Sequence, residues 1–197
     1  MAASTAYAPM TVVPRIAVKL PLVVPEPDGF VAARYETWPK VVGRLEYVGG
    51  RLEYMPPCGK NQQRVAVDVA TELNLWRRDH VDFVVGANEA GMLLDGEVRA
   101  ADAAVWRAGE PSNNELARTP PVLAVEICGE DESLETLLAK AAWYLERGAE
   151  AVWTVVPETR SVHVTTSAGT VEVTGRIPET PSLPDLSPLV ADFFRQI

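Results

Sequence analysis

Two apolar stretches, each interrupted by one carboxylate, decide how this chain folds. Residues 98–106 read VRAADAAVW and residues 122–128 read VLAVEIC, so Asp102 and Glu126 each lie inside an apolar run. Short runs of apolar and β-branched residues with turn residues between them predict buried strands. An ionised carboxylate in such a strand is costly unless it is paired, hydrogen-bonded or bound to a metal ion. The two acids therefore mark a candidate site.

The surroundings of these acids favour a metal site. In a strand, alternate residues share a face, so Asp102 lies with two alanines and Glu126 lies with Ala124 and Cys128. These small neighbours leave room around each carboxylate. Hard oxygen ligands of this kind suit Mg²⁺ or Mn²⁺. The sequence thus predicts that Asp102 and Glu126 bind such a cation.

A lysine on a predicted helix completes a possible trio with these acids. Residues 131–147 predict a helix whose apolar stripe comprises Leu134, Leu138, Ala141 and Leu145. Lys140 falls on the flank of that stripe. Its stem can follow the packed helix while the ammonium reaches a sheet, where it would position or deprotonate a water or stabilise developing charge. The alternative is a surface lysine that keeps its charge in solvent.

A short repeat nearer the amino terminus predicts a β-hairpin. The sequence Arg-Leu-Glu-Tyr occurs at residues 44–47 and again at 51–54, with Gly49 and Gly50 between the two copies. A two-residue turn at these glycines places Glu46 opposite Glu53. The repulsion between two facing carboxylates would be relieved by Arg44 and Arg51, by solvent or by a cation.

The remaining patterns indicate one mixed α/β domain. An amphipathic helix is predicted from residue 61 to about residue 80. Further strands are predicted at residues 83–85, 91–94, 152–156, 162–166 and 171–173, followed by a short terminal helix at 189–194. Residues 1–34 hold five of the 16 prolines and predict an accessory extended arm or short edge strands in place of a helix. Residues 35–197 form the predicted domain.

Composition and charge exclude several classes of protein. The chain has 197 residues, of which 47% are hydrophobic and 23% charged, so a disordered or fibrous chain is excluded. The net charge is −9, and twelve of the 27 acidic residues but only three basic ones lie at positions 82–135. That segment is either a solvated acidic surface or the surroundings of a metal site. The two cysteines form no zinc or redox motif, and no nucleophile elbow or phosphate-binding loop occurs.

Targeting and membrane signals are weak. The longest apolar runs fall well short of the ~18 residues that a membrane helix needs, and prolines interrupt the amino-terminal segment. A secretory signal is not expected. The low cysteine content is typical of a reducing compartment, so we expect a cytoplasmic protein.

The order Asp102, Glu126 and Lys140 resembles the PD-(D/E)xK nuclease superfamily and, within it, the Uma-two family of restriction endonucleases. The similarity extends over nearly the whole chain after residue 35. Residues 45–57 resemble the family's opening hairpin, residues 98–102 its Arg-x-Pro-Asp strand, and residues 121–126 its Leu-Val-Val-Glu-Val strand. Four further positions match family residues: Lys140, Tyr144, Gly148 and Trp153. The departures are Cys128 for the superfamily's usual lysine, Ala101 for proline, Gly49 for aspartate, Arg51 for glutamate, Gln62 for histidine and Val156 for aspartate.

This resemblance implies a fold and an activity. The expected fold is α/β (α+β), with a restriction-endonuclease-like mixed β-sheet core, flanking helices and an amino-terminal β-hairpin extension. The expected activity is metal-dependent hydrolysis of DNA phosphodiester bonds. Asp102 and Glu126 would hold Mg²⁺ or Mn²⁺, Lys140 would assist the attacking water, and Glu46 would add a direct or outer-sphere contact.

Two further expectations concern partners. Binding of DNA by an acidic chain needs the basic residues of the first helix (Lys60, Arg64, Arg77 and Arg78), the bound metal, or a homodimer that joins two weak surfaces. A homodimer is therefore expected. The alternative function is a catalytically inactive module of the same fold that binds or assembles with a partner, for which the acidic charge and the departures from the family pattern argue.

Overall fold

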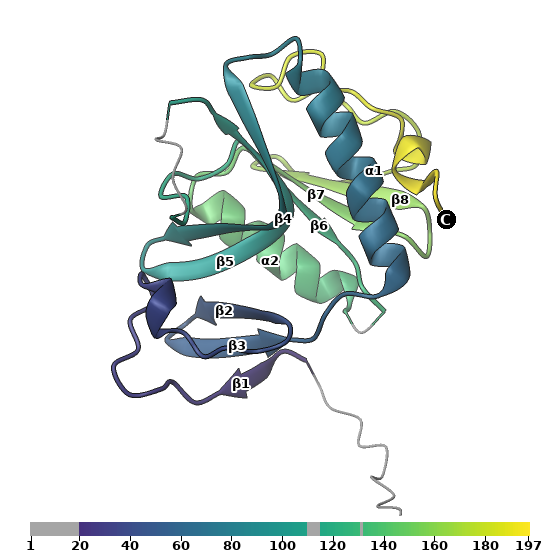
Figure 1. The fold of residues 1–197 in the computed structure, drawn as a ribbon. Coiled ribbons are helices and arrows are strands. Elements are labelled where there is room, and N and C mark those ends of the chain that lie inside the picture. The colour runs from purple at the N-terminus through teal and green to yellow at the C-terminus, as the bar shows by residue number, and fades with distance from the viewer. Residues whose placement is uncertain (1–19, 110–114, 131) are drawn as a thin grey trace, which may run out of the picture.

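A mixed β-sheet with one helix on each face forms the molecule (Figure 1). The structure, a computed structural model, describes residues 20–109, 115–130 and 132–197. The strands in this part of the chain are β1 (Leu22–Val24), β2 (Arg44–Val48), β3 (Arg51–Met55), β4 (Phe83–Leu94), β5 (Glu97–Arg107), β6 (Leu123–Ile127), β7 (Ala151–Val156), β8 (Ser161–Thr166) and β9 (Gly169–Val173). The helices are α1 (Lys60–Arg77) and α2 (Leu134–Glu146), with 3-10 turns η1 (Tyr35–Thr37) and η2 (Val190–Phe194).

The strands follow the order β1-β3-β2-β5-β6-β7-β8-β9, and β4 pairs with β5. Neighbouring strands are antiparallel except β6 and β7, which are parallel. Helix α2 connects β6 to β7, as a parallel pair requires a crossover. The predicted mixed sheet with flanking helices and a hairpin extension is confirmed.

The hairpin has the predicted register. Glu46 pairs with Glu53 and Tyr47 with Leu52 across β2 and β3. Gly49 and Gly50 have φ angles of +58° and +70°, which a two-residue turn of the type I′ class requires at both positions. The hairpin joins the main sheet where Tyr47 pairs with Val98 of β5. This junction brings Glu46 beside the strand that carries Asp102.

Residues 83–94 form one strand and not the two short runs predicted from the sequence. A bulge interrupts the pairing of β4 with β5 between Ala87 and Ala90. Asn88 and Glu89, at the bulge, both have φ of +62°. The break in the apolar pattern thus marks a bulge inside one strand, a feature common beside functional sites.

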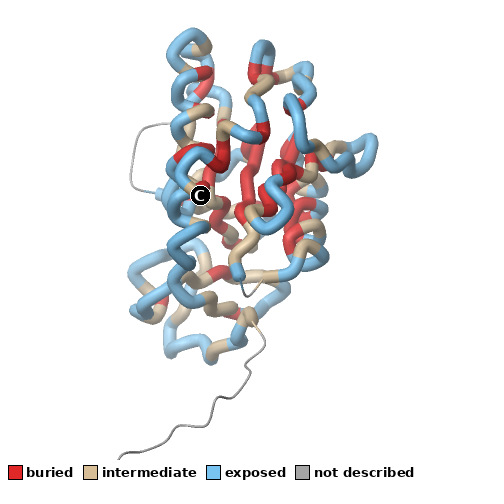
Figure 2. The backbone as a smooth tube through the Cα atoms, turned by 90° about the vertical axis from the view of Figure 1, so that its right-hand side faces the viewer, coloured by how far each residue is buried: buried red, intermediate tan, exposed pale blue. Residues whose placement is uncertain are grey.

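Each helix covers its own hydrophobic cluster. Helix α1 packs Val65, Val69, Leu73 and Trp76 against β5, β6, β7 and the carboxy-terminal segment. Helix α2 packs Ala141, Trp143 and Tyr144 on the other face. Buried residues are concentrated in the central strands, while many residues of α1 are exposed (Figure 2).

The buried face of α2 differs from the predicted apolar stripe. Leu137, Lys140 and Tyr144 are buried, whereas Leu134, Leu138 and Leu145 are only half-buried. The helix is therefore rotated toward the flank that carries Lys140. Ion pairs of that lysine, described below, make its burial possible.

Residues 20–34 contact the hairpin directly. Strand β1 pairs with β3, and Phe30 packs its ring against Trp38 and Tyr47 at centroid distances of 5.6 and 5.2 Å. Residues 1–19 of the predicted arm lie outside the described residues, as does Asp131 of the predicted second helix. Among the described helices, none is long and apolar enough to cross a membrane.

Candidate active site

The two predicted carboxylates lie where β5 and β6 separate. The ladder pairs Ala103 with Val125, so the next step of the register would place Asp102 opposite Glu126. At this step the Oδ2 of Asp102 accepts a hydrogen bond of 2.7 Å from the backbone N–H of Ile127. At the end of the ladder, the carboxylate of Asp102 thus accepts the hydrogen bond of a backbone N–H of β6 in place of a backbone carbonyl oxygen. Both acids lie on the face of the sheet that α2 covers.

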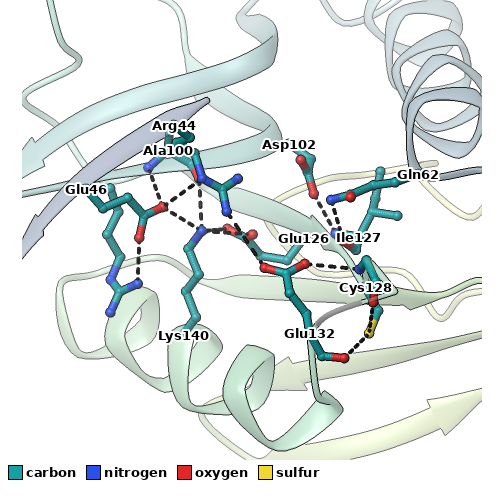
Figure 3. A network of polar contacts seen from close by, with 12 residues as sticks. Arg44, Glu46, Gln62, Ala100, Asp102, Glu126, Ile127, Cys128, Glu132 and Lys140 are labelled. Atoms are coloured by element: carbon teal, nitrogen blue, oxygen red, sulfur yellow. Dashed lines mark hydrogen bonds and ion pairs between the residues drawn. The ribbon is translucent and has the colours of Figure 1, made fainter. Parts of the chain in front are cut away.

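Lys140 extends from α2 into this region and binds three acceptors. Its Nζ lies 2.9 Å from Oε1 of Glu46, 3.0 Å from the carbonyl oxygen of Ala100 and 3.0 Å from Oε2 of Glu126 (Figure 3). The lysine side chain is only 6% exposed. An ammonium has three N–H donors, so all of them are used in this arrangement.

Glu46 is held by cations from three different elements. Its Oε2 accepts a 2.8 Å hydrogen bond from Arg99, its Oε1 accepts from Lys140, and Arg44 lies 3.7 Å away. Of the predicted sources of charge relief, Arg44 contributes, whereas Arg51 is exposed. Arg99 and Lys140 were not predicted as partners of Glu46, because each lies more than 50 positions away along the chain.

The buried Glu46 and Glu126 and the half-buried Asp102 have pKa values displaced in different directions. The cations Lys140, Arg44 and Arg99 outweigh burial at Glu46 and lower its pKa to about 2. Burial dominates at Asp102 and raises its pKa to about 6. Burial and the nearby charge of Asp102 raise the pKa of Glu126 to about 7. Glu46 is therefore a permanent anion near neutral pH, while Asp102 and Glu126 have too little positive charge around them.

The carboxylates Glu46 and Glu126 stabilise the charged form of Lys140. They raise the pKa of this lysine above its ordinary value although burial acts in the opposite direction. Cys128, two residues after Glu126, supplies no cation, and burial raises the pKa of its thiol. The ammonium beside Glu126 thus comes from α2.

Tyr144 and Gln62 complete the surroundings of the two acids. The hydroxyl of Tyr144 donates a 2.8 Å hydrogen bond to Oε1 of Glu126. The amide of Gln62, in the first turn of α1, donates a 3.0 Å hydrogen bond to the carbonyl oxygen of Ile127. Tyr144 lies one helical turn after Lys140, so the i, i+4 spacing on a helix was the sequence signal for its role.

Asp102 and Glu126 carry the oxygen donors that a hard divalent cation prefers, and in this structure both oxygens of Glu126 are engaged by Lys140 and Tyr144. Oδ1 of Asp102 is free of hydrogen bonds among the contacts of the described residues, and the raised pKa values show that a further positive charge would stabilise both ionised carboxylates. Mg²⁺ in enzymes is commonly held by one or two carboxylates, and waters and substrate phosphates complete its shell. Among residues 20–109, 115–130 and 132–197, no group of three or more His, Cys, Asp or Glu side chains is arranged to hold a metal ion.

Comparison with known families matches this chain to one of them. A family model described as Uma2, "Putative restriction endonuclease", matches residues 32–193. The chain belongs to the Uma2 family. The matched region contains Glu46, Asp102, Glu126 and Lys140, so the resemblance noted in the sequence is confirmed, and the protein is a member of a nuclease family.

A solved structure shares the fold of this Uma2 protein. It is titled a putative nuclease belonging to DUF820 from Anabaena variabilis ATCC 29413. The two chains superpose with a TM-score of 0.73 at 15% sequence identity, over 84% of this chain and 97% of the other. The similarity establishes the architecture of the sheet and helices. No curated protein matches the sequence.

Proposed function

We propose that this Uma2 protein is a metal-dependent endonuclease that hydrolyses DNA phosphodiester bonds. The observation that supports it most is the pair formed by the half-buried Asp102 and the buried Glu126, whose pKa values desolvation raises to about 6 and about 7. Perturbed carboxylates grouped with a buried lysine are typical of a functional site. The cation that would stabilise them supplies the Lewis acid that phosphodiester hydrolysis requires.

In the proposed mechanism, Asp102 and Glu126 hold Mg²⁺ or Mn²⁺. When bound, this cation polarises the scissile phosphate and lowers the pKa of a bound water. Lys140 assists the attacking water as a fixed positive charge, because its raised pKa and its three occupied donors do not suit a base. Glu46 anchors the ammonium of Lys140 beside Glu126 and thereby positions both groups.

The basic residues of α1 provide a limited DNA contact surface. Lys60 and Arg64 are exposed at the beginning of α1, the end of the helix from which Gln62 contacts Ile127, and at i±2 they lie on the opposite side of the helix from Gln62. Arg78 follows the other end of the helix, about 27 Å away at 1.5 Å per residue. The Nε of Arg77 donates to the carbonyl oxygen of Phe83. We therefore assign contact with the DNA strand beside the site to Lys60 and Arg64.

Cleavage of supercoiled plasmid and of single-stranded DNA tests the proposal. We expect strand cleavage by the wild-type protein with Mg²⁺ or Mn²⁺ and no cleavage with EDTA. Matched preparations of Asp102→Asn and Lys140→Met control for contaminating nucleases, because a contaminant would cleave equally in all three samples. Absence of cleavage together with tight binding of DNA or a protein would instead support a catalytically inactive binding module.

The pKa shifts predict an unusual dependence of stability on pH. Asp102 and Glu126 have raised pKa values in the folded state, so the folded protein binds more protons than the unfolded chain between about pH 8 and pH 4.5. The unfolding free energy contributed by these groups therefore increases as the pH falls through this window. Below it the trend reverses, because Glu46, with its pKa lowered to about 2, loses its contribution as it is protonated.

Addition of Mg²⁺ tests this pH dependence. A cation that replaces the missing protons stabilises the protein more at pH 8 than at pH 5, where protons already occupy the carboxylates. We expect thermal unfolding in EDTA to show a higher melting temperature at pH 5 than at pH 8, and Mg²⁺ to reduce this difference. An equal effect of Mg²⁺ at both pH values would contradict the assignment of Asp102 and Glu126 as its ligands.

We also propose that the protein acts as a homodimer. The motivation is its net charge of −9, which opposes DNA binding by a single copy. Two copies would double the number of basic residues that contact one duplex. Sedimentation or light scattering over a range of protein concentrations measures this directly, and a monomer at the concentration that supports cleavage would overturn it.

A further inference from the structure

The cations of the candidate site differ in how many of their donors are occupied. Lys140 uses all three N–H groups on Glu46, Ala100 and Glu126. Arg99 donates to Glu46 and lies over the ring of Trp143 at 5.1 Å. Arg44 makes one hydrogen bond, of 3.1 Å to Glu89, and its Nε has no hydrogen-bond partner among the described residues. Since a guanidinium carries five N–H donors, the two Nη groups of Arg44 retain unoccupied donors, whereas its Nε is buried.

The ion pairs of Arg44 are long or exposed. Its guanidinium lies 3.7 Å from Glu46 and 3.8 Å from Glu132, and its closer partner Glu89 is 43% exposed. Only the pair with the exposed Glu89 is of the surface kind that contributes little free energy and is exchanged at small cost. The arginine side chain is itself only 13% exposed, so its charge acts in partly desolvated surroundings.

Arg44 lies next to the proposed metal ligands. Its charge opposes the rise in pKa of both Asp102 and Glu126. In Figure 3 its guanidinium extends toward the carboxylate of Glu132, in front of Glu126. It also lines a hollow of about 150 Å³ whose wall includes Met55 and Gln62 together with the acidic residues Glu89, Glu130 and Glu132. That volume equals roughly five water molecules, enough for a phosphate group.

We propose that Arg44 is the phosphate-binding residue of the site. Its free guanidinium donors bind the non-bridging oxygens of a nucleic-acid phosphodiester, which displaces Glu89 and Glu132 from the arginine. A planar guanidinium pairs with phosphate through two parallel hydrogen bonds, which are stronger than the single contacts that it makes to these carboxylates. The substrate class in this assignment rests on the proposed nuclease function.

Binding of a fluorescent DNA duplex tests the assignment without cleavage. Fluorescence anisotropy in Ca²⁺ over a series of salt concentrations gives both affinity and its salt dependence. We expect Arg44→Met to weaken binding about tenfold and to reduce the salt slope by about one, as loss of a phosphate contact does. Arg44→Lys, which keeps the charge, should restore the slope. Arg118→Met is the matched control, because Arg118 is exposed and precedes β6 at the end opposite Glu126.

Neutralising the carboxylates that compete for Arg44 gives a second, opposite readout. Glu89→Gln and Glu132→Gln leave Arg44 intact, so they test the proposal even if Arg44→Met fails to fold. Each of these two substitutions should raise the affinity for DNA severalfold. The control Glu172→Gln, which removes an exposed charge on the distant strand β9, should raise the affinity less. A merely structural role of the Arg44 ion pairs predicts weaker binding in these variants.

The outcomes separate this assignment from the proposed function. If the wild-type protein cleaves DNA, and Arg44→Met binds DNA with unchanged affinity and unchanged salt dependence, the phosphate-binding role of Arg44 is overturned and the nuclease function stands. Arg44-dependent DNA binding without cleavage by the wild-type protein supports the phosphate site and overturns the nuclease function. Absence of both DNA binding and cleavage overturns both.

Discussion

Replacing Asp102 with asparagine is expected to abolish metal-dependent cleavage while leaving the fold as stable as before or more stable. The substitution removes one of two proposed metal-binding carboxylates. Loss of Lewis-acid stabilisation worth about 4 kcal/mol lowers the rate on the order of 10³-fold. The amide oxygen of asparagine can still accept the hydrogen bond that the N–H of Ile127 donates to Asp102.

The stability of this variant distinguishes a functional from a structural carboxylate. Burial raises the pKa of Asp102 to about 6, so its ionised form destabilises the metal-free protein at pH 8. A neutral asparagine removes that cost, and the unfolding free energy in EDTA should equal or exceed that of the wild type. The conservative control is Asp95→Asn, because the Asp95 side chain is 77% exposed and lies in the turn before β5.

Either of two measurements would contradict this account of Asp102. Wild-type cleavage by the asparagine variant would show that Asp102 holds no essential cation. A large loss of stability in EDTA would show that the carboxylate is a structural acceptor. Plasmid cleavage and chemical denaturation of the same preparation provide both values.

The parts of the fold that sequence predicted correctly depend on local patterns. The register of the hairpin follows from Gly49 and Gly50 and from the repeated sequence Arg-Leu-Glu-Tyr on either side of them. All of these residues lie within twelve positions of one another. Strand alternation places Asp102 and Glu126 on the face that α2 covers, because the side-chain period of a strand is fixed at two. The bulge in β4 interrupts that period, and the sequence therefore indicated two strands where there is one.

The parts that sequence missed depend on charges brought together from distant segments. The sequence placed Lys140 on the flank of the apolar stripe with its ammonium reaching the sheet, but it did not predict that this flank is the buried face or that Glu46 is a partner. In the folded protein, Glu46 and Glu126 neutralise that ammonium from positions 94 and 14 residues away, and the helix turns this face inward. Arg44 and Glu132 are likewise joined only by the fold. Ion pairs of this kind follow from the topology of the fold, and the periodicity of a single helix or strand does not predict them.

Lys140→Met is expected to cause the largest loss of stability among the site variants. Methionine retains much of the apolar stem but leaves Glu46 and Glu126 without the ammonium between them. Removing one partner of a buried ion pair typically costs about 3–5 kcal/mol. Chemical denaturation should show this loss at pH 8, and the exposed residue Lys60 provides the matched control variant Lys60→Met.

The pH dependence of that loss identifies which carboxylate is left unpaired. Glu46 keeps Arg99 at 2.8 Å and Arg44 at 3.7 Å, whereas Glu126 keeps only the hydroxyl of Tyr144 among the contacts of the described residues. Without Lys140, the pKa of Glu126 should rise further, and protonation at pH 5 should recover much of the lost stability. Combining Lys140→Met with Glu126→Gln should likewise recover stability at pH 8. If the double variant is instead as unstable as the sum of the two single variants, the buried ammonium does not act through Glu126, and its place beside the proposed metal ligands has another cause.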